Sequence, residues 1–140
     1  LGLPQKWPPL EPCSAWIALA DKDDLHHKKA AAAYFSILKD FRILVTSNLV
    51  IAETYIVLLN ELGHKKAMEL LERIKASPRI LKTYSNENIE AEAEQILSKY
   101  SDHDFSYTDA VSFAIMKRQR IKKAFSLDKH FAIAGFINLP

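Results

Sequence analysis

The chain has 140 residues and a formal net charge of +2, with 49% hydrophobic and 26% charged residues. This size and balance indicate one soluble globular domain, and the small positive charge permits a nucleic-acid partner without requiring one. Cys13 is the only cysteine, which excludes an intrachain disulfide and a cysteine-based zinc cluster and fits a reducing cytoplasm. Because no apolar run reaches membrane-spanning length and no signal-peptide pattern opens the chain, we expect a cytoplasmic protein without a membrane partner.

Residues 1–13 are rich in proline and predict an irregular, extended segment. Beyond an apolar stretch at 14–20, apolar periodicity predicts helices over 26–39, 47–62, 64–76, 86–100 and 108–119. Short apolar or alternating runs predict strands over 42–46, 79–84, 124–127 and 136–139. Such an alternation of strands and helices indicates an α/β domain, in which helices cover both faces of a parallel sheet.

Three carboxylates occupy apolar elements, where an unsatisfied charge is costly. Asp128 directly follows the 124–127 strand, and Asp109 lies in the first turn of the last predicted long helix. Glu53 lies opposite the main apolar stripe of its helix, on a second side that is apolar too. That main stripe comprises Ile51, Tyr55, Leu58, Leu59 and Leu62. Clustered carboxylates are hard oxygen ligands for Mg²⁺ or Mn²⁺, so we expect the three acids to face one groove and share an ion.

Each acid also has a purely structural explanation. Asp109 completes a Ser106-x-x-Asp109 pattern, close to a capping box, and an acid suits the first turn of a helix. Asp128 could be a turn residue or the cap of a short following helix, and Glu53 could be an exposed helix residue. The basic run at 117–123 is either a solvated helix end or a contact for a nucleic-acid backbone.

The order of several motifs resembles a known family, the PIN domains, and most closely the toxin ribonucleases of VapBC-type toxin–antitoxin pairs. The resemblance covers roughly residues 14–140. It rests on the stretches 14–19, 46–48, 53–54, 104–114, 124–131 and 135–136. Their ordered combination is specific, whereas no single stretch would be sufficient.

The resemblance implies a three-layer α/β/α sandwich with a parallel sheet whose first strand is central, and metal-dependent cleavage of single-stranded or looped RNA. It implies that Glu53, Asp109 and Asp128 are the catalytic acids that hold Mg²⁺ or Mn²⁺, with Ser14 and Thr108 as supporting hydroxyls. Members of this family usually form homodimers and are silenced by a small antitoxin. We therefore expect the toxin component of such a pair, with RNA as substrate and an antitoxin as partner.

One position departs from the family pattern. PIN domains carry an aspartate two residues before the serine that corresponds to Ser14, and this chain has Pro12 there. Glu11 cannot replace that aspartate without a bulge, because adjacent strand residues point to opposite faces, and the nearby prolines could disrupt the first strand. The departure predicts weak or absent hydrolysis. It leaves two alternatives open: a catalytically impaired PIN-like binding module, and a structural domain in which all three acids are caps.

Apolar side chains crowd the predicted 26–39 helix and indicate a partner surface. They are Tyr34, Phe35, Ile37 and Leu38. By the family resemblance, this helix and the 64–76 helix would supply a homodimer face or a groove for an antitoxin segment.

Overall fold

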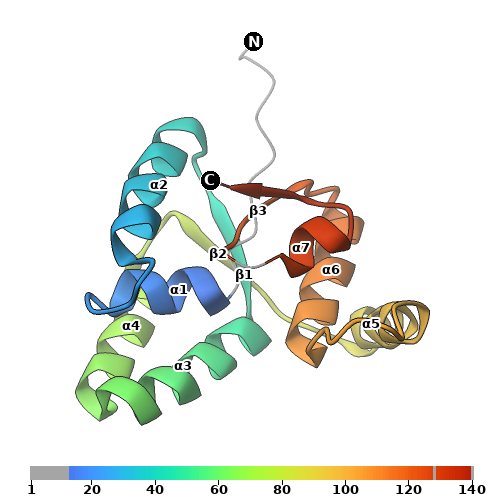
Figure 1. Ribbon diagram of the computed structural model, residues 1–140, viewed down its shortest axis with the longest axis horizontal. Coiled ribbons are helices and arrows are strands. Elements are labelled where there is room, and N and C mark those ends of the chain that lie inside the picture. The colour runs from blue at the N-terminus through green and yellow to red at the C-terminus, as the bar shows by residue number, and fades with distance from the viewer. Residues whose placement is uncertain (1–12, 128, 140) are drawn as a thin grey trace.

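The computed structural model describes residues 13–127 and 129–139, and Figure 1 shows short strands with helices on both sides of them. The elements in chain order are α1 (Cys13–Ala20), α2 (His27–Asp40), β1 (Leu44–Ser47), α3 (Asn48–Leu62), α4 (His64–Ala76), β2 (Ile80–Thr83), α5 (Glu87–Lys99), α6 (Tyr107–Gln119), β3 (Lys123–Phe125), α7 (His130–Ile133) and β4 (Ile137–Leu139). In these two described ranges, no helix is both long enough and apolar enough to span a membrane. The α/β class is confirmed.

The strands pair in parallel, as their alternation with helices predicted. β1 pairs with β2 in a register that sets Leu44 opposite Ile80, and β3 pairs with β4 so that Lys123 lies opposite Ile137. Each pair is joined by a helical crossover, the connection that parallel strands require.

Successive residues of β1 enter different parts of the core. Leu44 belongs to a cluster with side chains of α1 and α2, whereas Val45 belongs to a cluster built mainly from α5 and α6. Because side chains alternate along a strand, this division shows that β1 is covered on both faces. Figure 1 shows the same arrangement, with α1 and α2 on one side of the strands and α5, α6 and α7 on the other.

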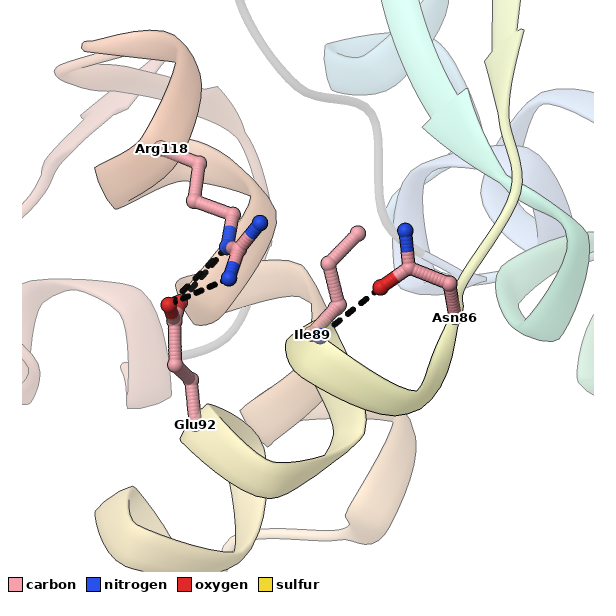
Figure 2. Close-up of polar contacts among 4 residues, drawn as sticks. All are labelled: Asn86, Ile89, Glu92 and Arg118. Atoms are coloured by element: carbon pink, nitrogen blue, oxygen red, sulfur yellow. Dashed lines mark hydrogen bonds and ion pairs between the residues drawn. The ribbon is translucent and has the colours of Figure 1, made fainter.

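The predicted helix ends are largely confirmed. Ser47 is both the last residue of β1 and the N-cap of α3, where its Oγ accepts a hydrogen bond from the Val50 N–H at 3.1 Å. Gly63 ends that helix with a φ of 89°, a left-handed conformation that glycine adopts without strain. Asn86 caps α5 in the same manner, through the Ile89 N–H at 3.0 Å (Figure 2).

Helix α6 is buried all around its middle. Every residue from 110 to 116 is buried, because α6 packs against α3, α5 and α7. A helix enclosed in this way has no solvent-facing side, so its sequence carries little amphipathic periodicity. The site described below begins at the first turn of this enclosed helix.

The apolar stripe predicted for α3 is corrected. The buried line of α3 is Val50, Thr54 and Leu58, whereas Leu59 of the predicted stripe is 37% exposed. The reason is that α3 packs against α1, α4 and α6 together, so tertiary contacts rather than one apolar stripe decide its burial.

The predicted partner surface on α2 is mostly core. Ile37 is buried, and the ring of Tyr34 stacks on that of Phe125 with centroids 6.3 Å apart. Leu38 packs against the same cluster. Of the four side chains, Phe35 alone is exposed, at 69%. The apolar crowding of this helix therefore reflects contacts with α1 and the strands.

Candidate active site

Asp109 lies in the first turn of α6 and closes a capping box with Ser106. The Ser106 Oγ accepts a hydrogen bond from the Asp109 N–H at 3.0 Å, and the Asp109 Oδ2 accepts one from the Ser106 N–H at 3.2 Å. Two N–H groups that a helix start would leave unpaired are thereby satisfied. The capping role that the sequence allowed for Asp109 is confirmed, and it also holds the carboxylate at the positive end of the helix dipole.

His130, the first residue of α7, contacts the same carboxylate. Its Nδ1 lies 3.0 Å from the Asp109 Oδ2, and because the carboxylate can only accept, Nδ1 is the donor. The side chains of His130 and Asp109 are 30% and 18% exposed. This contact, which joins residues 21 positions apart, was not predicted from the sequence. The one available signal was that His130 lies within the family-like stretch 124–131.

Aromatic rings pack against the side chain of His130 and against its neighbour Phe131. The His130 ring meets Phe105 edge-on at a centroid distance of 5.4 Å, and Phe105 meets Phe113 of α6 at 5.1 Å. Phe131, next to His130, contacts Phe113 at 4.9 Å. Perpendicular ring contacts of this kind are favourable and directional, so they orient α7 against the start of α6.

Glu53 lies on α3, which follows directly from the carboxyl end of β1. Its side chain is half-buried, as the apolar second side of this helix predicted. Since α3 packs against α6, Glu53 and Asp109 lie on two helices in contact. Within the described residues, no hydrogen bond or ion pair holds the Glu53 carboxylate. Such a carboxylate has its acceptor capacity available for another partner.

The remaining predicted site residues are only partly described. Thr108 is half-buried and precedes Asp109 in the first turn of α6. Ser14 lies in α1, but its side chain is outside the described part of the structure. Asp128 and Pro12 both lie outside the described residues, so the shared groove of Glu53, Asp109 and Asp128 remains a prediction.

The candidate ligand atoms of this site are of the type that binds a hard divalent cation. Glu53 and Asp109 offer carboxylate oxygens, the ligands that Mg²⁺ and Mn²⁺ prefer. Across residues 13–127 and 129–139, no three His, Cys, Asp or Glu side chains form a group that could hold a metal. A complete site of the predicted composition therefore requires Asp128, the acid that lies between the described ranges.

The basic run at 117–123 is partly occupied by contacts within the protein. Arg118 donates to both carboxylate oxygens of Glu92 on α5 at 2.7–3.0 Å (Figure 2). This hydrogen bonding lowers the pKa of Glu92 below its usual 4.5 and raises that of Arg118. The Lys123 Nζ lies 5.6 Å from the centroid of the Phe41 ring. Besides Arg118, the exposed basic residues of the run are Lys117, Arg120 and Lys122.

Comparison with known proteins gives consistent matches over nearly the whole chain. The curated endonuclease VapC20 of two Mycobacterium tuberculosis strains, named as specific for 23S rRNA, is 29% identical over 126 residues, which cover 90% of this chain and 93% of the relative. The crystal structure of M. tuberculosis VapC20, described as a toxin that cleaves the sarcin–ricin loop, matches with a TM-score of 0.86 and covers 94% of this chain and 98% of that one.

A second solved structure supports the fold alone. FitAcB from Neisseria gonorrhoeae is 21% identical and matches with a TM-score of 0.64, covering 94% of this chain and 96% of that one. The family model of the PIN domain matches residues 13–137, which include α1 through the first residue of β4. The protein therefore belongs to the PIN domain family.

Proposed function

We propose that this protein is a metal-dependent endoribonuclease that cleaves RNA phosphodiester bonds as the toxin of a toxin–antitoxin pair. Membership of the PIN family and the near full-length similarity to VapC20 support the reaction class. The observation that carries the proposal is the fixed, half-buried carboxylate of Asp109, which lies on a helix in contact with the one that bears Glu53.

The proposed site consists of Glu53, Asp109 and Asp128 as ligands of one Mg²⁺ or Mn²⁺ ion. When bound, such an ion lowers the pKa of a coordinated water and neutralises the charge that develops on the phosphodiester. The described residues support the orientation of one ligand: the capping box and His130 hold Asp109, and α3, the helix that bears Glu53, packs on α6. Ser14 and Thr108 are proposed as supporting hydroxyls.

The proposed substrate is a single-stranded or looped RNA. VapC20, whose match covers 90% of this chain, is named as an endonuclease specific for 23S rRNA. Exposed Lys117, Arg120 and Lys122 at the end of α6 could contact phosphates of such an RNA. Neutralising any of them should weaken RNA binding without regard to base sequence and should reduce its salt dependence.

The proposed partners are an antitoxin and a second copy of the chain, in the cytoplasm. The family resemblance supports both, and the exposed apolar side chains Phe35, on α2, and Ile56, on α3, are available for such contacts. Light scattering at high micromolar concentration should give the mass of a dimer. A monomer at that concentration would contradict the homodimer.

The test of the proposed function is a cleavage assay with a looped RNA in Mn²⁺ and in excess chelator. Asp109→Asn should abolish Mn²⁺-dependent cleavage and weaken Mn²⁺ binding, whereas Asp102→Asn, an exposed loop acid nearby, should leave both unchanged. If Asp109→Asn bound Mn²⁺ and cleaved RNA as well as the unmodified chain, the proposed metal site would be wrong.

Comparison of the unmodified chain with Pro12→Asp in this assay distinguishes a nuclease from a PIN-like binding module. With one acid missing from the family set, we expect weak cleavage by the unmodified chain and stronger cleavage by Pro12→Asp. Robust cleavage by the unmodified chain would refute this view of Pro12 and strengthen the enzyme proposal. Mn²⁺ and RNA binding without turnover in either chain would instead favour a PIN-like binding module.

A further inference from the structure

We infer that His130 is a positioning residue for Asp109, holding its carboxylate so that Oδ1 is the oxygen presented to a cation. The inference rests on the proposed function, because it names what orients one acid of that site. It does not require His130 to bind the ion or to touch the substrate.

The two oxygens of Asp109 have unequal surroundings. Oδ2 accepts both hydrogen bonds, from the Ser106 N–H at 3.2 Å and from the His130 Nδ1 at 3.0 Å. Oδ1 makes no hydrogen bond or ion pair with any described residue. Two donors on one oxygen fix the rotation of the carboxylate about its Cβ–Cγ bond, so the lone pairs of Oδ1 remain for a ligand.

The histidine is itself held in place. Its ring contacts Phe105 edge-on, and Phe105 packs against the fully buried Phe113. The adjacent Phe131, also fully buried, contacts Phe113 from α7. Displacing Nδ1 from Asp109 would therefore disturb a chain of buried rings, which is the kind of support that a precisely oriented ligand needs.

The contact requires a donor, not a charge. Nδ1 carries a hydrogen in the imidazolium ion and in one neutral tautomer, so the carboxylate can be held in either protonation state of His130. Without this donor, Asp109 would keep only the backbone hydrogen bond of the capping box. Removal of a group that orients a metal ligand typically weakens metal affinity about 10- to 100-fold.

Two variants of the full chain distinguish the effect of the Nδ1 hydrogen-bond donor from the effect of the imidazole ring. His130→Phe keeps a ring against Phe105 and removes the donor. His130→Asn removes the ring but places an amide N–H₂ at the same number of bonds from Cβ as Nδ1. Mn²⁺ affinity is measured for each by electron paramagnetic resonance of the free ion, and a thermal melt records folding.

We expect His130→Phe to weaken Mn²⁺ binding by about tenfold or more and His130→Asn to restore most of the affinity. If His130→Phe melts below the assay temperature, His130→Ala replaces it as the donor-free variant, with the same expected loss. Wild-type affinity in the donor-free variant, or equal losses in it and in His130→Asn, would overturn the inference.

Asp109→Asn in the same titration distinguishes this failure from failure of the proposed function. A loss in Asp109→Asn without a loss in His130→Phe would leave the metal site standing and remove only the role of His130. Unchanged binding in Asp109→Asn would overturn the metal site itself, and the inference with it.

Discussion

Replacing Ser112 with alanine should stabilise this protein, although Ser112 lies in its most enclosed helix. Ser112 is 1% exposed, and its Oγ has no hydrogen-bond partner among the described residues. A buried polar group without a partner costs about 1–3 kcal/mol. Ser112→Ala removes that cost, and alanine also adds a few tenths of a kcal/mol of helix propensity, roughly 0.5 at most.

The void left by the removed oxygen lowers the stability of Ser112→Ala only slightly. Removing one oxygen leaves a void of about 10 Å³, which at roughly 24 cal/mol per Å³ costs about 0.2 kcal/mol. With the lower end of the unpaired-hydroxyl cost, the net gain is about 1 kcal/mol. For a domain of this size, a gain of that magnitude raises the melting temperature by about 4 °C.

The measurement is urea denaturation followed by circular dichroism, with the m-value checked for constancy. The matched control is Ser106→Ala, the same substitution at the exposed N-cap of the same helix, where the hydroxyl accepts from the Asp109 N–H. That control should lose about 1 kcal/mol. If Ser112→Ala were destabilised by more than about 0.5 kcal/mol, the hydroxyl would be satisfied in solution and the reasoning would be wrong.

Three other outcomes are expected. Arg79→Met should lose about 2 kcal/mol in the same denaturation assay, because the Arg79 guanidinium donates to the carbonyls of Leu38, Phe41 and Arg42; an unchanged midpoint would show that these bonds contribute nothing. The contribution of Glu92 to the free energy of unfolding should be fully present above its ordinary pKa of 4.5 and should disappear as the pH falls through its lowered pKa in the folded protein. Glu92→Gln should therefore be less stable than the unmodified chain at neutral pH but equally stable in acid. Glu53→Gln should weaken Mn²⁺ binding without lowering the melting temperature, and a clear drop in that temperature would reveal a structural role.

The helix ends and the strand pairing could be predicted because their signals are local. A cap such as Ser47 or Asn86 acts on an N–H group three residues away, and Gly63 acts on its own backbone conformation. The parallel pairing followed from the order of strands and helices, which limits the possible topologies. The half-burial of Glu53 also followed from its immediate neighbours on α3.

The missed features depend on contacts between distant elements. Nothing near His130 in the sequence indicates that its ring meets Asp109, and nothing near Arg79 indicates that it binds the end of α2. The stripe on α3 was assigned incorrectly because three neighbouring helices, rather than apolar character, decide which of its side chains are covered. The apolar residues of α2 were interpreted as a partner surface because composition alone does not distinguish core from interface.

The role of Asp109 in the capping box, beside its proposed role as a metal ligand, bears on how such a protein would lose its activity over evolution. An acid that serves only a metal site is under no constraint once catalysis is dispensable, and its loss relieves charge repulsion and often stabilises the protein. Asp109 differs, because replacing it would also remove the capping box at the start of the enclosed helix α6. Selection for folding alone would therefore retain this acid in an inactive descendant.

Glu53 has no comparable structural duty among the described residues. If the proposed site is right, an aspartate at position 109 is therefore weaker evidence of nuclease activity than a carboxylate at position 53. This chain has Glu53, and it has Pro12 at the position where the family resemblance predicts an aspartate. Under the proposed site, any loss of catalysis would have begun at position 12 and would not yet have reached Glu53 on α3.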